Sequence, residues 1–159
     1  MDPAIVLREA TRADIDALVE FNAAMAWETE HKRLDPAVLR SGVEAVFDDV
    51  RRGIYLVAGH AGAVVAGLLV TYEWSDWRCG DWWWVQSVYV RPEARGRGVF
   101  RALYGAIEAR ARTAGAVGLR LYVERDNARA RRTYAALGMQ ETAYRMYEHP
   151  FAVPAADRR

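Results

Sequence analysis

The spacing of hydrophobic positions along the chain alternates between the periods of strands and of helices. A short β-branched run at residues 5–7 predicts a strand, and hydrophobic residues then recur every three or four positions from Ile15, which predicts an amphipathic helix. Thr11 and Asp14 fit the threonine-x-x-acid pattern of a helix start. Asp35 and Pro36 supply an N-cap and a first-turn proline for a second helix, which we expect to end at Gly53.

The middle of the chain has the pattern of strands. Two apolar runs at 54–58 and 63–72 flank the turn-like stretch 59–62 and predict a hairpin. A loop at 72–81 then leads into the aromatic and β-branched run 82–90, which predicts a central strand.

The last third of the chain alternates between helical and strand-like patterns. The expected elements are a helix at 97–113, a strand at 117–123, a helix at 128–137 and one or two strands within 144–151. A meander of antiparallel strands followed by a strand–helix–strand unit predicts a mixed α/β fold. We expect residues 1–153 to form a single domain and 154–159 to be a short polar tail.

Composition limits the class of protein. The 159 residues are 52% hydrophobic, enough for one sizeable core, and 22 basic against 21 acidic residues give a charge of +1. This near-neutral balance argues against a nucleic-acid partner held through phosphates. Cys79 is the only cysteine and the three histidines are scattered, so neither a disulfide framework nor a metal site is expected. No apolar run reaches the roughly 20 residues of a membrane span, and the first residues lack a signal pattern, which favours a cytoplasmic protein without a membrane partner.

The stretch 90–101, Val-Arg-Pro-Glu-Ala-Arg-Gly-Arg-Gly-Val-Phe-Arg, places two glycines directly before a predicted helix. The first N–H groups of a helix lack intrahelical acceptors and its dipole favours negative charge, so this arrangement predicts an anion site. A P-loop is excluded because the chain has no Gly-Lys pair. A dinucleotide fingerprint is excluded because Arg101 stands where the third glycine would be.

Two segments resemble motifs of the GCN5-related N-acetyltransferase (GNAT) family. The first resembles its acyl-CoA loop, Arg/Gln-x-x-Gly-x-Gly/Ala after a Val-x-Pro-like turn: Arg95 and Gly98 match, whereas Phe100 replaces the usual glycine or alanine. The second runs from Asn127 to Met139 and resembles Asn-x-x-Ala-x-x-x-Tyr-x-x-x-Gly-Phe, with methionine for the last residue. The two motifs are separated as in the family, and the predicted N-terminal strand and helix correspond to its opening, so the resemblance covers about residues 5–151.

The resemblance implies the GNAT fold, a mixed and mostly antiparallel sheet with a central split, flanked by helices. It implies transfer of an acetyl group from acetyl-CoA, without a metal, to a primary amine by direct attack in a ternary complex. Loop amides would bind the pyrophosphate, and a backbone amide of Val88, Tyr89 or Val90 in the preceding strand would stabilise the oxyanion. The cofactor-binding residues implied are Val88, Tyr89, Val90, Arg95, Gly96, Arg97, Gly98, Val99, Phe100, Arg101 and Asn127.

Side chains in these segments leave alternatives open. Asn127 either contacts the cofactor or caps the following helix. Direct phosphate contact and a solvated basic rim are alternatives for the side chains of Arg91, Arg95, Arg97 and Arg101.

The catalytic residues follow from the same resemblance. Tyr134 corresponds to the general acid that protonates the departing thiolate of coenzyme A. The family has no fixed general base; Glu28 is our first choice and Glu73 the second. The acceptor would be a small-molecule or peptide amine, and a homodimer is consistent with the family. The alternative function is a catalytically inactive domain that binds or senses acyl-CoA.

The run Trp82-Trp83-Trp84 lies in the predicted central strand. Successive side chains of a strand point to opposite faces, so Trp83 and its two neighbours must occupy different environments. These rings either fill the core or a dimer interface, or form an aromatic wall for a cationic or apolar acceptor.

Overall fold

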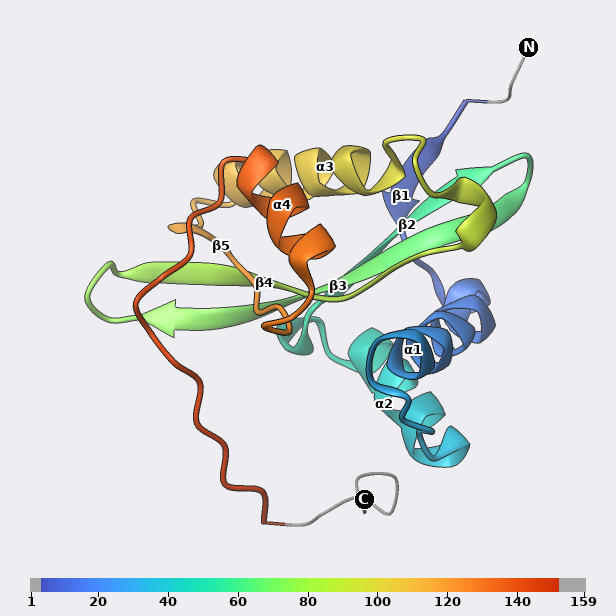
Figure 1. Ribbon diagram of the computed structural model, residues 1–159, viewed down its shortest axis with the longest axis horizontal. Helices are drawn as coiled ribbons and strands as arrows, with labels where there is room; N and C mark the ends of the chain where they lie inside the picture. The colour runs from blue at the N-terminus through green and yellow to red at the C-terminus, as the bar shows by residue number, and fades with distance from the viewer. Residues whose placement is uncertain (1–3, 152–159) are drawn as a thin grey trace. The chain divides into compact units, whose positions relative to one another are not determined.

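The computed structural model describes residues 4–151, in which five strands form one sheet in the order β1-β2-β3-β4-β5 (Figure 1). Neighbouring strands are antiparallel except β4 and β5, which are parallel. The strands are β1 Val6–Glu9, β2 Ile54–His60, β3 Ala63–Ser75, β4 Gly80–Val90 and β5 Gly118–Arg120. The chain divides between Leu121 and Tyr122 into two compact units, and the whole sheet belongs to the first.

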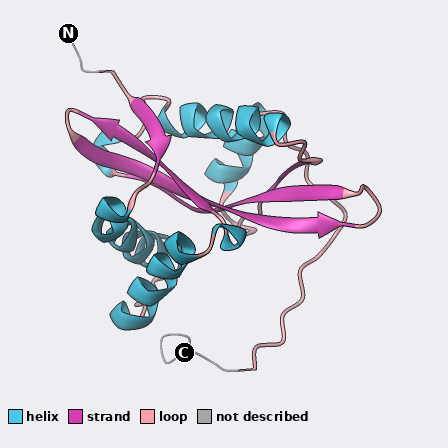
Figure 2. Cartoon of the chain, turned by 180° about the vertical axis from the view of Figure 1, so that it is seen from behind, coloured by secondary structure: helices cyan, strands magenta, loops and turns pink. Residues whose placement is uncertain are grey.

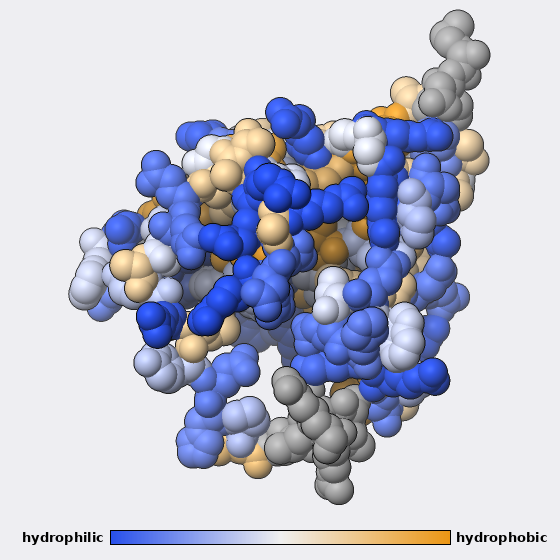
Figure 3. Space-filling model, viewed as in Figure 1, coloured by the Kyte–Doolittle hydropathy of each residue, from blue (hydrophilic) through white to orange (hydrophobic). Residues whose placement is uncertain are grey.

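Helices cover both faces of the sheet in the first unit. Figure 2 shows α1 (Ile15–Glu30) and α2 (Pro36–Asp48) on one face and α3 (Val99–Thr113) on the other. None of the helices within residues 4–151 combines the length and apolar content that a membrane span requires. On the side of the molecule drawn in Figure 3, hydrophilic residues predominate at the surface.

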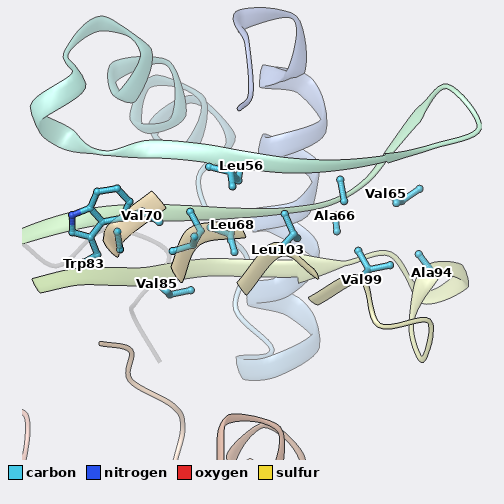
Figure 4. Close-up of a cluster of buried hydrophobic side chains, with 13 residues drawn as sticks. Leu56, Val65, Ala66, Leu68, Val70, Trp83, Val85, Ala94, Val99 and Leu103 are labelled. Atoms are coloured by element: carbon cyan, nitrogen blue, oxygen red, sulfur yellow. The ribbon is translucent and has the colours of Figure 1, made fainter. Parts of the chain in front are cut away.

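Two hydrophobic clusters hold these layers together. The cluster between the sheet and α3 includes Leu56, Leu68 and Leu103, which are at most 2% exposed (Figure 4). The second cluster, between the sheet and α1 and α2, includes Phe21 and Val57. Because neighbouring strand residues alternate between faces, Leu56 and Val57 contribute to opposite layers.

Helix starts follow the sequence signals. The Asp14 carboxylate accepts a hydrogen bond from the Thr11 backbone N–H (2.7 Å), as expected for a threonine-x-x-acid start. Asp35 caps α2 by accepting bonds from the N–H groups of Ala37 (2.9 Å) and Val38 (3.0 Å). The α2 helix ends at Asp48, before the expected Gly53, because the short 3-10 turn η2 (Val50–Arg52) intervenes.

The expected loop at 72–81 is wrong in its extent. Strand β3 continues to Ser75 and β4 begins at Gly80, so only a tight turn joins them. Cys79 in this turn has φ of 48°, a left-handed conformation that ends the turn. Cross-strand pairing of Glu73 with Trp82 and of Trp74 with Asp81 outweighs the polar composition from which we predicted a loop.

The second unit contains α4 (Ala128–Ala136), close to the expected helix. The strands expected within 144–151 are wrong, since the structure has no strand there. Pro150 lacks the N–H that a ladder needs, and the side chains of Tyr147 and Phe151 are 90% and 98% exposed. The expected tail at 154–159 lies outside the described residues.

Candidate active site

Strands β4 and β5 separate after a short parallel contact. They pair only at Trp82, Trp83 and Trp84, where β5 contributes Gly118 to Arg120. From Val85 onward, β4 pairs within the described part of the chain with β3 alone. Successive N–H groups of a strand point to opposite sides, so some amides of this stretch are directed away from β3 and are suited to bind a carbonyl oxygen.

A β-bulge distorts β4 beside this opening. The pairing shifts between Gly67–Tyr89 and Leu69–Gln86, so that Ser87 and Val88 together oppose one residue of β3. Ser87 has φ of 50°, which is rare for a residue with a side chain. The bulge re-aims the backbone of the segment 88–90, from which we expected the oxyanion amide.

The glycine loop leads from β4 into α3 through the 3-10 turn η3 (Pro92–Ala94). Gly96 and Gly98 have φ of 75° and 76°, and a Cβ atom at either position would meet no atom within 4 Å. Backbone conformation rather than crowding therefore requires glycine here. Gly98 is the N-cap of α3, which begins at Val99, two residues later than expected.

The first turn of α3 is suited to an anion. Gly98 provides no side-chain cap, and the turn contains no acidic residue. The positive end of the helix dipole therefore acts without a neutralising carboxylate in that turn. The Phe100 ring lies near Tyr104, with centroids 6.2 Å apart, consistent with a ring that continues the apolar side of the helix while the backbone of the first turn faces the loop.

Glu28 and Arg95 form an ion pair beside β4. Arg95 Nη2 donates to Glu28 Oε2 (2.6 Å), and the Tyr89 hydroxyl donates to Glu28 Oε1 (2.8 Å). Burial raises the pKa of Glu28, but the hydrogen bonds from Tyr89 and Arg95 and the charge of Arg95 outweigh it, so this pKa is lowered. Burial, followed by the bond to Glu28, raises the pKa of Tyr89. The structure thus brings together three residues that we singled out separately.

Glu73, the second candidate base, lies opposite Trp82, which belongs to the part of β4 that is still paired with β5. Its carboxylate accepts bonds from Arg120 Nη1 (2.9 Å) and from the indole N–H of Trp84. Arg120 also lies over the Trp82 ring, with its guanidinium carbon 4.1 Å from the centroid. Glu73 pairs across the ladder with Trp82, and Thr71 pairs with Trp84, so these side chains share one face of the sheet.

The three tryptophans divide between the two faces as expected. Trp83 is 8% exposed and belongs to the core cluster under α3. Trp82 and Trp84 are half-buried and lie on the opposite face, the one that α1 and α2 partly cover. The indole nitrogen of Trp82 is buried without a hydrogen-bond partner. Trp83 is therefore a core residue. Trp82 and Trp84 lie where they could form the aromatic wall for an acceptor that the sequence suggested.

The second unit carries the other two candidate residues on α4. Asn127 Oδ1 accepts a bond from the Ala130 N–H (3.0 Å), so this side chain caps the helix. Ala130, Tyr134 and Leu137 are its less exposed side, at the spacing of one helical face. Burial raises the pKa of the Tyr134 hydroxyl, which keeps the phenol protonated at neutral pH.

Sequence reasoning missed two residues of the first unit that contribute to this region. Glu20 pairs with Arg91, with Arg91 Nη2 2.9 Å from Glu20 Oε2, and Arg120 bridges Glu73 and Trp82. Periodicity identified the buried side of α1 but gave no signal for a partner 71 residues away. Within residues 4–151, no three His, Cys, Asp or Glu residues are grouped so that they could hold a metal ion.

Known proteins share both sequence and fold with this chain. The model of a family described as "Acetyltransferase (GNAT) family" matches residues 18–139. Mycothiol acetyltransferase from Corynebacterium aurimucosum is 33% identical over 120 residues, which are 74% of this chain and 40% of that protein. The chain therefore spans 40% of the length of this curated relative.

Solved structures show the same fold. The crystal structure of a possible acetyltransferase from Clostridium difficile 630 is 45% identical, with a TM-score of 0.87, and the match covers 94% of this chain and 99% of that one. An aminoglycoside N-acetyltransferase solved in complex with CoA has a TM-score of 0.78 at 13% identity, over 96% of this chain and 98% of that one. At this low identity, the second likeness shows the fold alone.

Proposed function

Because the chain belongs to the acetyltransferase (GNAT) family, we propose that it transfers the acetyl group of acetyl-CoA to a primary amine by direct attack in a ternary complex. The observation that carries the proposal is the glycine loop, which follows the bulged end of β4 and opens into the uncapped N-terminus of α3. The segment proposed to stabilise the oxyanion is thereby followed along the chain by the loop proposed to bind the pyrophosphate. We propose that residues 1–153 act as one catalytic domain.

The loop fits the pyrophosphate of acetyl-CoA. Two left-handed glycines turn the backbone, and α3 offers its first N–H groups with no acidic residue in the first turn. We assign this contact to amides between Arg95 and Arg101, and the oxyanion contact to an amide among Val88, Tyr89 and Val90. In the reaction the amine nitrogen forms a bond to the thioester carbonyl carbon, and the carbon–sulfur bond then breaks.

Tyr134 is proposed to protonate the departing thiolate. An unperturbed phenol and thiol differ by about 1.5 pKa units, so the transfer is uphill by roughly 2 kcal/mol before the environment acts. Burial raises the pKa of Tyr134 further, which makes this proton harder to lose. The acid therefore depends on close positioning at the sulfur rather than on a lowered pKa.

The ammonium of the acceptor must lose a proton, and two carboxylates are candidates for the base. Glu28 bonds to Tyr89, whose backbone belongs to the proposed oxyanion stretch, but its lowered pKa weakens it as a base. Glu73 lies opposite Trp82, where the two parallel strands are still paired. We propose that one of them accepts the proton directly or through water. The residue whose Glu→Gln variant loses the acidic limb of the pH profile of kcat/KM is the base, because a general base must be deprotonated to act.

The acceptor is proposed to bind on the sheet face that carries Trp82, Trp84 and Glu73. An aromatic surface next to carboxylates suits a small cationic amine or a peptide amine. One solved relative is named as an aminoglycoside N-acetyltransferase, so aminoglycosides belong in the first acceptor panel together with polyamines, amino acids and peptides. We also propose a cytoplasmic location and a homodimer; cell fractionation and light scattering test these two points.

The experiment that tests the function is release of free thiol from acetyl-CoA by the purified protein across this panel. Acceptor-dependent release is expected, and Tyr134→Phe should lower kcat by about 100-fold or more while preserving the packing of the ring. Full activity of the variant at every pH would remove the acid role from Tyr134. No release with any amine, despite measurable CoA binding, would favour the alternative of an inactive acyl-CoA-binding or sensing domain.

A further inference from the structure

Two arginines on either side of the turn η3 reach back to the same helix, α1. Arg91 and Arg95 precede and follow Pro92–Ala94, the turn that leads into the glycine loop. Arg91 Nη2 donates to Glu20 Oε2 (2.9 Å), and Arg95 Nη2 donates to Glu28 Oε2 (2.6 Å). Both ends of the turn are therefore tied to one helix by ion pairs.

Each arginine makes the same three kinds of contact. Arg91 also donates from Nε to the carbonyl of Val64 (3.2 Å) and lies over the Phe21 ring, 5.2 Å from its centroid. Arg95 donates from Nε to the carbonyl of Val90 (2.8 Å) and lies over the Tyr89 ring, 5.4 Å from its centroid. A carboxylate, a backbone carbonyl and an aromatic face thus fix each planar guanidinium, a set of contacts that lysine could not reproduce.

The two sets of contacts are joined in the layer between α1 and β4. The rings of Phe21 and Tyr89 contact each other, with centroids 5.3 Å apart, and both are buried. Glu20 and Glu28 are eight positions apart, about two helical turns, so they lie on similar sides of α1 roughly 12 Å apart along its axis. The carboxylates are thereby spaced to hold the two ends of one short turn.

We propose that Glu20, Glu28, Arg91 and Arg95 form a clasp that sets the position of the pyrophosphate-binding loop, so that α1 controls the affinity for acetyl-CoA. The inference rests on the proposed function, since it takes the loop as the acyl-CoA site. It makes Arg91 and Arg95 positioning residues whose guanidinium groups are directed toward α1. It also gives Glu28 a positioning role, and the kinetic consequences of that role differ from those of a base.

Because CoA is negatively charged, the direction in which its dissociation constant changes distinguishes two roles for Arg91 and Arg95. If Arg91 and Arg95 acted mainly as phosphate ligands, Glu20→Gln or Glu28→Gln would release a guanidinium and remove a negative charge, and CoA would bind more tightly. If the carboxylates hold the clasp, the same substitutions loosen the loop and CoA binds more weakly. The two roles predict opposite shifts in one dissociation constant.

The test is the dissociation constant of CoA, measured by calorimetry at about 0.15 M salt, where distant exposed charges are screened. We expect Glu20→Gln and Glu28→Gln each to weaken binding about two- to fivefold, and the double variant about tenfold or more. Glu108→Gln is the matched control, because Glu108 forms an exposed ion pair with Arg112 in the last two turns of α3, remote from the clasp. This control should leave the dissociation constant unchanged.

Two further measurements distinguish the clasp from a simple effect of charge and from a base role for Glu28. Arg95→Lys keeps the charge but cannot hold Glu28, the Val90 carbonyl and the Tyr89 ring together, so it should weaken CoA binding like Glu28→Gln. In steady-state kinetics, Glu20→Gln, at a residue with no proposed part in proton transfer, should raise KM for acetyl-CoA and leave kcat in place. Glu28→Gln should raise KM in the same way, and a fall in its kcat would report a base role for Glu28. Thermal unfolding of each variant establishes that it is folded.

The outcomes distinguish this inference from the proposed function. Unchanged or tighter CoA binding by folded Glu20→Gln and Glu28→Gln variants would overturn the clasp and leave the enzyme intact. Loss of kcat with an unaltered dissociation constant would overturn the clasp in favour of a base role for Glu28. Failure of the parent protein itself to bind CoA would overturn the proposed function, and also the clasp, which assumes that the loop binds acyl-CoA.

Discussion

At the scale of single residues, Asp14 shows how a buried charge is stabilised and what that implies for acid stability. It is 5% exposed and accepts paired bonds from Arg8, with Nη1 to Oδ2 at 2.7 Å and Nη2 to Oδ1 at 2.8 Å. The hydrogen bond from Arg8 is the main reason that the pKa of Asp14 falls from 3.8 to about 2, although burial opposes it. The ion pair therefore fixes the turn that starts α1.

This carboxylate predicts an acid-labile contribution to folding. Because the folded pKa is the lower one, the contribution is complete above the unfolded pKa of 3.8 and is lost as the pH falls toward about 2. Asp14→Asn should reduce the free energy of unfolding at pH 7 by about 2 kcal/mol and flatten its decline between about pH 4 and pH 2. Urea titrations across pH measure both effects.

Asp16→Asn is the control for this measurement. Asp16 pairs with Arg40 at the surface, and its side chain is 86% exposed, so its loss should cost less than about 1 kcal/mol. Equal effects of the two variants would contradict the account given for Asp14.

Gly118 illustrates a second requirement at the residue scale, space for a neighbouring ring. A Cβ atom here would lie 2.5 Å from Cζ3 and 3.1 Å from Cε3 of Trp82. Gly118→Ala should push that ring off its position under Arg120 and lower the free energy of unfolding by about 1–3 kcal/mol. Gly42→Ala, where no atom lies within 4 Å of the added Cβ on α2, should instead stabilise by about 0.5–1 kcal/mol.

At the scale of elements, α4 depends on its N-cap. Asn127 satisfies the Ala130 N–H, so Asn127→Ala should cost about 1 kcal/mol of helix stability, whereas Asn127→Ser should retain most of it. Hydrogen exchange of the α4 amides measures the difference. If the alanine variant exchanged like the parent, the cap would contribute nothing. A loss of CoA affinity in both variants would add cofactor contact to the role of this residue.

Strand β4 shows how one element combines several tasks. Its first residues are held on both edges, by β3 and by β5, and place Trp83 in the core. Beyond Trp84 it pairs with β3 alone, and the bulge at Ser87 changes the direction of its amides. A rigid, fully paired beginning therefore supports an irregular end, which is where the proposed chemistry takes place.

At the scale of the whole molecule, ligand binding should raise stability, because the folded chain alone offers the loop. CoA at about a hundred times its dissociation constant should increase the free energy of unfolding by about 2.7 kcal/mol and raise Tm by a few degrees. Scanning calorimetry measures the rise in Tm with CoA and compares it with the rise at the same concentration of adenosine. If neither ligand changed the Tm of the folded protein, acyl-CoA binding would be contradicted.

Much of the fold and part of the site could be predicted from local patterns. The hairpin of β2 and β3, the helix starts at Thr11 and Asp35 and the alternation of the three tryptophans all depend on neighbours in sequence. The glycine loop was recognisable for the same reason, since left-handed turns at Gly96 and Gly98 and an uncapped helix leave a local signature. The sequence by itself therefore determined the family, the loop and the candidate residues.

Tertiary structure decided what those residues contact. Nothing local indicates that Arg95 pairs with Glu28 or Arg91 with Glu20, because each pair joins positions about 70 residues apart on different elements. The extent of β3 and β4 and the absence of strands within 144–151 likewise depend on cross-strand pairing and burial, which outweigh local propensity. Short-range patterns fix conformation along the chain, whereas the partners of a charge are fixed only when packing brings distant elements together.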